Sequence, residues 1–180
     1  MNNNEQIEIA LSKMKLGILL LGCIVFVALG IGYIVKAQTI DIPILGNPIL
    51  LYSLGSISII VFGFALITIL QKFLDRKAGL VINNEGIIDN SSGVSLGLVL
   101  WSDIEEIKVK KVMNQSFLML MVKNPQDYID RAENSFKRKS LKANYKKYGS
   151  PIGISTNSLK SSHNNLHGLL TEKLKENKSQ

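Results

Sequence analysis

The sequence predicts a membrane-embedded helical hairpin followed by an α+β soluble domain. Two uncharged stretches near the start are each long enough to cross a bilayer, and the later part of the chain changes from strand-like to helical periodicity. The 180 residues are 46% hydrophobic but have a formal net charge of +7. The apolar and charged residues must therefore be segregated along the chain. Composition excludes low-complexity disorder, and a single Cys excludes a disulfide scaffold. The short, charged chain also excludes a polytopic transporter.

The two predicted spans cover residues 16–35 and residues 49–70. A helix of about 20 residues rises roughly 30 Å, the hydrocarbon thickness of a bilayer. Neither span carries a charge, so no ion site or proton relay is predicted inside the membrane. The alternatives are a pair of buried core helices and, for the first span, a cleaved signal peptide. Both fit less well, because the runs lack an amphipathic face and the first exceeds the usual signal core.

Basic residues flank the hairpin at its two outer ends, whereas the connecting loop holds only Lys36, offset by Asp41. The positive-inside rule then predicts that both termini are cytoplasmic. Tyr33 and Tyr52 fall at the loop-side ends of the spans, where aromatic rings favour the membrane interface. The predicted juxtamembrane anchors are Lys13, Lys15, Lys72, Arg76 and Lys77.

Small residues within the spans predict close helix packing. Ala28 and Gly32 form a small-xxx-small pair, and further glycines occur in both spans. These positions serve either the hairpin itself or a homo-oligomer, or they reflect the high frequency of glycine in membrane helices. Cys23 is interpreted as a packing residue without redox function. The further glycines are Gly22, Gly30, Gly55 and Gly63.

Outside the hairpin the chain divides into four predicted segments. Residues 1–15 form an N-terminal cytoplasmic segment on which Ile7, Leu11 and Met14 share a helical stripe. Residues 71–77 form a basic juxtamembrane linker, residues 78–176 a folded domain, and residues 177–180 a frayed tail. From Gln71 onward there are 18 Lys and Arg against 11 Asp and Glu. The whole net charge therefore lies in the cytoplasmic part.

The first half of that domain predicts strands. Residues 80–82 and 87–88 flank a tight turn, and further strands are predicted over residues 94–101, 104–112 and 116–122.

The second half is predicted to be mainly helical. Asn124-Pro125 begins a helix expected to reach Tyr148 and end at Gly149. A short strand over residues 151–155 follows, and a last helix starts near Asn157 or Ser158. This order predicts a small antiparallel barrel or curved sheet with a closing helix. The apolar stripe of the last helix is Leu159, Leu166, Leu169, Leu170 and Leu174.

Several segments together resemble bacterial pleckstrin-homology-like membrane proteins, in particular an uncharacterised subfamily. They are Gly79-Leu80-Val81-Ile82, Gly86-Ile87-Ile88-Asp89-Asn90-Ser91-Ser92, Trp101-Ser102-Asp103-Ile104-Glu105-Glu106-Ile107, Val122-Lys123-Asn124-Pro125 and Tyr148-Gly149-Ser150-Pro151-Ile152. The resemblance covers roughly residues 15–175. It implies two transmembrane helices before a cytoplasmic pleckstrin-homology-like (PH-like) barrel, in the bacterial cytoplasmic membrane, and it implies no reaction. The first hairpin loop, residues 83–86, holds an acid and no cation, which argues against specific phosphoinositide recognition.

The densest charge feature is residues 131–147, with seven cations and one acid, Glu133. Because the domain is tethered to a leaflet, anionic lipid headgroups are the nearest partners for such a run. An acidic protein, a solvated helix face and, less favoured, nucleic acid are the alternatives. The candidate contacts are Arg131, Lys137, Arg138, Lys139, Lys142, Lys146 and Lys147.

No motif predicts catalysis. His163 and His167 share a helical face, as zinc ligands can, but neither a third ligand nor an adjacent Glu accompanies them. Trp101 is interpreted as a core or barrel-rim residue. We therefore expect no catalytic, cofactor or metal site. The expected function is a non-enzymatic interaction or assembly module whose partner is an unidentified membrane or cytosolic protein. The alternatives are an anionic-lipid sensor and, less favoured, a metal-dependent hydrolase.

Overall fold

A computed structural model of the chain describes residues 6–39, 47–112 and 115–179. The chain forms two compact units, Lys13–Asp75 and the combination of Met1–Ser12 with Arg76–Gln180. The first unit consists of two long apolar helices, and the second is an α+β unit with antiparallel sheets. The predicted helical hairpin with an α+β soluble part is therefore confirmed.

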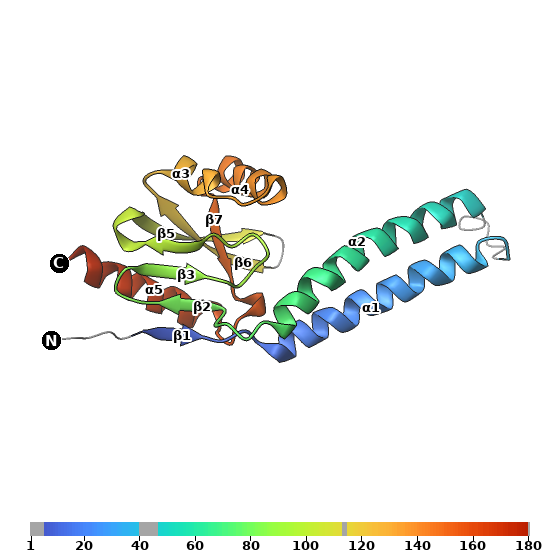
Figure 1. The fold of residues 1–180 in the computed structure, drawn as a ribbon, viewed down its shortest axis with the longest axis horizontal. Coiled ribbons are helices and arrows are strands. Elements are labelled where there is room, and N and C mark those ends of the chain that lie inside the picture. Colours follow the sequence, from blue (N-terminus) through green and yellow to red (C-terminus); the bar gives the residue numbers. More distant parts are fainter. Residues whose placement is uncertain (1–5, 40–46, 113–114, 180) are drawn as a thin grey trace. The chain divides into compact units, whose positions relative to one another are not determined.

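Helices α1 (Lys13–Lys36) and α2 (Pro48–Leu74) lie side by side, and both are long and apolar enough to cross a membrane (Figure 1). Asn47 caps α2, because its side chain accepts a hydrogen bond from the Ile49 amide at 3.0 Å. The more buried positions of α1 recur every three or four residues, which is the spacing of a coiled-coil seam. They are Leu16, Leu20, Cys23, Val27, Gly30 and Ile34.

The two helices approach most closely at Gly30 and Gly55. A Cβ on Gly55 would lie 2.6 Å from the Gly30 carbonyl oxygen, and a Cβ on Gly30 would lie 2.9 Å from that of Gly55. Ser58 donates a hydrogen bond of 2.9 Å to the carbonyl of Phe26 in the other helix, and the Phe26 and Phe62 rings stack at 4.3 Å. By contrast, Ala28 and Gly32 are exposed on α1. The small residues thus divide between this seam and the outer surface.

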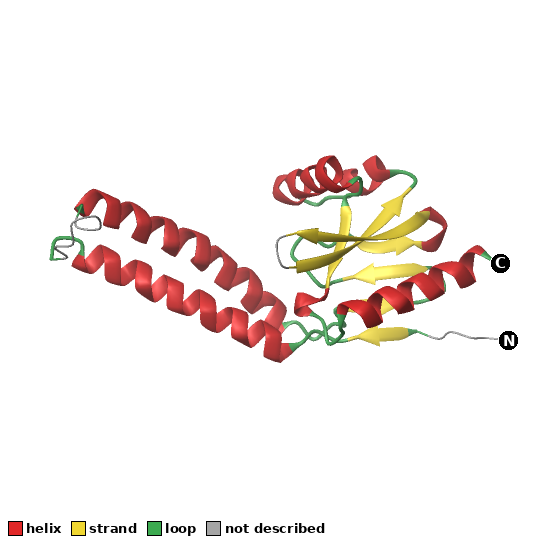
Figure 2. Ribbon diagram, turned by 180° about the vertical axis from the view of Figure 1, so that it is seen from behind, coloured by secondary structure: helices red, strands yellow, loops and turns green. Residues whose placement is uncertain are grey.

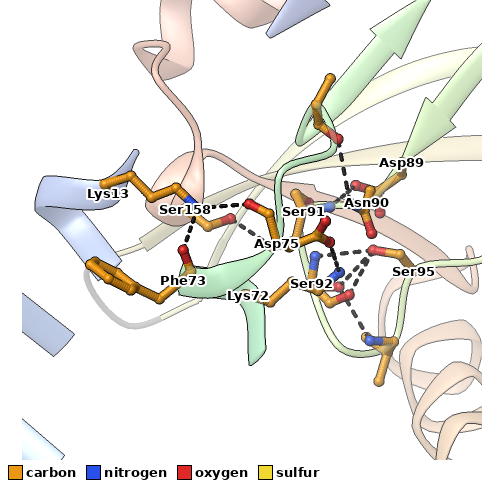
Figure 3. Close-up of polar contacts among 12 residues, drawn as sticks. Lys13, Lys72, Phe73, Asp75, Asp89, Asn90, Ser91, Ser92, Ser95 and Ser158 are labelled. Carbon is orange, nitrogen blue, oxygen red and sulfur yellow. Dashed lines mark hydrogen bonds and ion pairs between the residues drawn. The ribbon is translucent and has the colours of Figure 1, made fainter. Parts of the chain in front are cut away.

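Lys13 joins the two helices at the end of the hairpin opposite the loop. Its ammonium group donates to the carbonyl of Asp75 at 2.7 Å and to that of Phe73 (Figure 3). Phe73 lies in the last turn of α2 and Asp75 is the C-cap, and a cation at this end of a helix is favoured by the helix dipole. The hairpin is therefore closed by a polar contact at its charged end.

The first sheet has the strand order β1-β2-β3-β4 and is antiparallel throughout. Its strands are β1 (Ile7–Ile9), β2 (Leu80–Ile82), β3 (Gly86–Asp89) and β4 (Gly97–Leu100). Ile7 pairs with Ile82 and Ile9 with Leu80. The first strand therefore comes from before the hairpin and the other three from after it.

The second sheet has the order β5-β6-β7. Among the described residues the two sheets stay separate and no closed barrel forms. Helices α3 and α4 lie at the opposite end of this unit from β1 and α5 (Figures 1 and 2). The elements are η1 (Trp101–Asp103), β5 (Ile104–Val112), β6 (Gln115–Val122), α3 (Pro125–Asp130), α4 (Ser135–Tyr148), β7 (Ile152–Ser155), η2 (Thr156–Ser158) and α5 (His163–Lys178).

The N-terminal segment differs from its prediction. The helical stripe of Ile7, Leu11 and Met14 does not form, because Ile7 lies in β1 and Leu11 makes an isolated β-bridge to Leu159. Leu11 is buried, whereas Met14 is exposed on α1. The structure thus places Met1–Ser12 within the soluble unit, where the sequence predicts a separate segment.

Further contacts fix this segment to the rest of the unit. The Ser12 amide donates to the Ser158 carbonyl at 2.7 Å, and the Ser158 hydroxyl donates to the Ser91 carbonyl at 2.6 Å (Figure 3). Ser91 lies in the turn after β3, where its amide donates to the Asp89 carboxylate at 2.8 Å. Residues from three distant parts of the chain therefore meet at one point.

Two helix predictions also need correction. The helix predicted from Asn124 to Tyr148 is split into α3 and α4, because Asn134 caps a new helix by accepting from the Lys137 amide at 2.8 Å. The last helix begins at His163 and not near Asn157, since residues 156–158 form η2 and Leu159 is held by Leu11. Of the predicted leucine stripe, Leu166, Leu170 and Leu174 are buried on α5.

Gly55→Ala tests the helix seam. We expect it to destabilise the hairpin by about 1–3 kcal/mol, because its Cβ would overlap the Gly30 backbone. Gly63→Ala is the matched control, since nothing lies within 4 Å of a Cβ at that position. The measurement is the SDS-induced unfolding midpoint of the purified chain in mixed micelles. Equal midpoints for the two variants would contradict the proposed close approach.

A second prediction concerns the contribution of β1. Because Ile9 pairs with Leu80, the two ends of the hairpin insertion lie at the same end of the β1–β2 pair. A flexible linker of about eight residues, reaching roughly 15 Å, should therefore replace residues 13–75 without unfolding the soluble unit.

The fragment 78–180 serves as the comparison because it lacks β1 and Leu11. Loss of the buried Leu11 side chain alone should cost about 2–5 kcal/mol. Urea unfolding followed by circular dichroism compares the two proteins. The same midpoint for both would show that the N-terminal segment is dispensable.

Candidate functional site

Tyr128 fixes α3 against the first sheet. Its side chain is fully buried, and its hydroxyl donates to the Asp103 carboxylate at 2.6 Å while accepting from the Leu100 amide at 3.4 Å. Burial raises the pKa of Tyr128 to about 12, and the hydrogen bond to Asp103 adds to this effect. This pair leaves no local signal in the sequence, because the two residues are 25 positions apart.

Arg131 completes the cover over β4. Its guanidinium group lies 4.4 Å from the centre of the Tyr128 ring and donates to the Leu98 carbonyl at 3.5 Å. Since β4 is the last strand of its sheet, Leu98 and Leu100 present backbone groups that no neighbouring strand can bind. Tyr128 binds the Leu100 amide and Arg131 binds the Leu98 carbonyl. Arg131 therefore has a structural contact as well as a charge.

Helix α4 packs through one face and exposes the other. Leu141 is buried against Ile129 and Ala132. Gly149 ends the helix with φ of 80°, a left-handed conformation that favours glycine. The Asn144 amide group donates to the Pro151 carbonyl at 3.4 Å. These contacts fix which side of α4 faces solvent.

Most of the predicted basic contacts lie on the exposed side of α4. Arg138, Lys139, Lys142 and Lys146 are exposed, and none of them forms an ion pair with any described residue. Lys147 is also exposed and lies 5.2 Å from the Tyr148 ring centre. Phe136 is 61% exposed on the same helix. The result is a cationic surface that contains an aromatic ring.

Lys137 differs from its neighbours because it has an acidic partner. Its ammonium group contacts Glu133 at 2.9 Å and, by that hydrogen bond, lowers the pKa of the Glu133 carboxyl. Of the seven candidates, Arg131, Lys137 and Lys147 therefore have contacts within the described residues, and among these contacts that of Lys137 is with an acid. The name basic α4 surface is used below for Arg138, Lys139, Lys142, Lys146 and Lys147.

The predicted membrane-flanking residues lie at the ends of the two helices. Tyr33 and Tyr52 are exposed, near the loop-side ends of α1 and α2. Lys72 contacts Asp75 at 3.8 Å, and Lys13 joins the helix ends as described above. Lys15 is half-buried, while Arg76 and Lys77 are exposed.

Neither the histidine pair of α5 nor Trp101 lies in a catalytic or metal-binding cluster of the described residues. The His163 and His167 rings stack 6.5 Å apart, but the described residues contain no group of three His, Cys, Asp or Glu able to hold a metal. Trp101 is buried and donates to the Asn83 carbonyl at 2.8 Å. An open groove of about 680 Å³ beside it is lined by both acids and lysines, including Glu105 and Lys178.

Comparisons of the chain with known protein families, with curated proteins and with solved structures gave no match.

The Tyr128 hydroxyl makes a testable contribution to alkaline stability. A folded-state pKa of about 12 against an ordinary value of 10.0 means that the folded chain retains this proton more strongly. The resulting stability is fully present below pH 10 and is lost as pH rises from 10 to about 12. This difference of about two pKa units corresponds to about 2–3 kcal/mol in the free energy of unfolding.

Tyr128→Phe is the control because it removes the titrating hydroxyl and keeps the ring. Urea unfolding between pH 9 and 12 should show a shallower fall in stability for this variant than for the parent. Parallel pH profiles would contradict the assigned Tyr128–Asp103 interaction.

Proposed function

We propose that this chain is a non-enzymatic interaction module of the bacterial cytoplasmic membrane, in which a hairpin displays a PH-like domain at the cytoplasmic face. The observation that carries the proposal is the basic α4 surface, whose exposed cations lack acidic partners among the described residues. An acidic surface of a membrane or cytosolic protein is the partner that this charge fits.

The topology supports the proposal. Strands β1 and β2 share one sheet although the hairpin separates them in the sequence. The chain on either side of the hairpin must therefore lie on the same side of a membrane that α1 and α2 both cross. The flanking lysines and arginines favour the cytoplasmic side.

The PH-like assignment is supported by the order of the elements. In the described part of the chain, seven antiparallel strands in two sheets are followed by the C-terminal helix α5, three of whose leucines are buried. Helices α3 and α4 are inserted between β6 and β7. The basic α4 surface lies on this insertion.

Sensing of anionic lipid is a second candidate, favoured by Phe136. Lysines together with an aromatic side chain that is 61% exposed are typical of a helix that binds at a membrane surface, where basic residues form the polar face and aromatic residues the other. Each lysine near an anionic leaflet contributes about 1 kcal/mol, so three would contribute about 3 kcal/mol, or roughly 100-fold in binding.

A photo-crosslinker at Ala143, which is exposed between Lys139 and Lys146, tests both candidates in native membranes. We expect a discrete protein adduct that falls at least roughly tenfold in Lys139→Glu/Lys142→Glu/Lys146→Glu, because charge reversal repels an acidic partner. Lys123→Glu/Lys160→Glu/Lys175→Glu, which reverses three exposed lysines outside α4 and β5, is the matched control and should retain the adduct.

The identity of the adduct separates the candidates. A lipid adduct that requires anionic lipid would favour the sensor over the protein module. A protein adduct that is unaffected by the α4 reversal would remove the basic α4 surface from the proposal.

A further inference from the structure

Among the described residues, strand β5 is a long edge strand with no strand beyond it. It pairs only with β6, and most of its residues are exposed, including Val109 at 41%. The β5–β6 register runs to the pair Val112–Gln115 at the two-residue connection. In an antiparallel hairpin of this register, Ile107, Val109 and Lys111 direct their backbone N–H and C=O groups away from β6.

These outer backbone groups bind nothing within the described part of the chain. Apart from the ladder to β6, no hydrogen bond from a described residue reaches the backbone of residues 107–111. Only the start of β5 is closed, by a bulge between Ile104 and Glu106 and by Lys178, whose ammonium group donates to the Glu105 carbonyl. About five residues of open edge remain, Glu106 to Lys110 and their neighbours.

The edge of β4 differs, because Tyr128 binds the Leu100 amide and Arg131 binds the Leu98 carbonyl. The edge strand β1 has only three residues. Native proteins normally cover or shorten such edges, since an open edge pairs with other strands. With nine residues, β5 is the longest of the described edge strands, and its open part is therefore a candidate for pairing.

The sequence of β5 is chemically self-complementary when read in reverse. It is Ile104-Glu105-Glu106-Ile107-Lys108-Val109-Lys110-Lys111-Val112. A second copy placed antiparallel about Lys108 sets Glu106 opposite Lys110 and Ile107 opposite Val109, each twice. Acids then face bases and apolar residues face apolar residues, the cross-strand pairs that stabilise sheets.

We propose that β5 is a self-association surface, at which two copies of this chain pair antiparallel about a two-fold axis through Lys108. The two three-stranded sheets then join into one continuous sheet of six strands. The proposal concerns a different surface from α4 and does not depend on the partner of that helix.

The charge pattern argues for a second copy and against a simple protective role. Lysines alone suffice to keep an edge strand from aggregating. Acids confined to the first half and bases confined to the second half are what a two-fold symmetric contact requires, because each residue must meet its counterpart in reverse order. Tethering both copies in one membrane raises their effective concentration.

The register follows from the backbone and the charges. A shift of the axis by half a residue would bring inward-directed backbone groups to the edge and turn side chains to the wrong face. An axis at Val109 would set Lys108 opposite Lys110, a repulsive pair occurring twice. An axis at Ile107 would set Lys110 opposite Ile104. With the axis at Lys108, the one like-charged pair is Lys108 opposite Lys108 of the second copy. Within each chain, Glu106 contacts Lys108 at 3.0 Å.

Cysteine crosslinking of the full chain in its native membrane tests the register. The only native cysteine, Cys23, is first replaced by Ala. Single variants Ile107→Cys, Lys108→Cys, Val109→Cys and Lys110→Cys are then oxidised and run on non-reducing gels. We expect the dimer band to be at least several-fold stronger for Lys108→Cys, since residue 108 faces itself, whereas two copies of residue 110 are offset by roughly 13 Å along the strand. Equal bands, no band, or a maximum at another position would overturn the proposal.

A charge exchange provides the decisive control in the Lys108→Cys background. Glu105→Lys/Glu106→Lys makes β5 wholly basic, and Lys110→Glu/Lys111→Glu makes it wholly acidic. Each variant alone should lose the crosslink, and the two co-expressed with different tags should regain it as a heterodimer, which also shows that both fold. Crosslinking by either variant alone, or no recovery in the mixture, would overturn the proposal. Lys139→Glu/Lys142→Glu/Lys146→Glu should crosslink like its parent whether or not α4 binds an acidic partner.

Discussion

The pairing of β1 with β2 is the constraint on which the rest of the structure depends. It joins residues 7–9 to residues 80–82 across the whole hairpin. The soluble unit is therefore built from the chain before α1 and the chain after α2. Leu11 and Ser12 extend the contact to Leu159 and Ser158 near the end of the chain. Because a sheet cannot be divided by a bilayer, this pairing places residues 7–9 and residues 80–82 on the same side of any membrane that the hairpin crosses. The soluble unit and the hairpin are thus separate in packing but linked in topology.

The edges of the two sheets determine which surfaces are available for partners. An unpaired strand leaves backbone groups without hydrogen bonds, and the chain meets this demand at β4 with the side chains of Tyr128 and Arg131. That contact also positions α3, and through Ile129, Ala132 and Leu141 it positions α4. The basic α4 surface is therefore a consequence of how β4 is covered, whereas β5 keeps its open edge.

Much of the candidate surface could be predicted from sequence, since seven cations within residues 131–147 are visible as a charge run. Which of these cations contact other parts of the chain could not be predicted. Arg131 stacks on a ring three residues earlier and reaches a strand 33 positions away, and Lys137 is bound by Glu133. Whether a cation faces solvent or an intrachain partner depends on where its helix packs, which periodicity alone does not give. The break at Asn134 did leave a local signal, because an Asn before a helical run is a common N-cap.

The sequence by itself determined the hairpin, most strands and the segregation of charge, because each follows from local hydrophobicity, turn residues or spacing. The tertiary structure decided the role of residues 6–12, whose short alternation of apolar and polar side chains fits a helix or a strand equally well. A three-residue strand is formed by its partner, not by its own propensity, and that partner lies more than 70 residues away. It also decided that Gly30 and Gly55 form the helix seam while Gly22, Gly32 and Gly63 remain open, since only the facing helix distinguishes equivalent glycines.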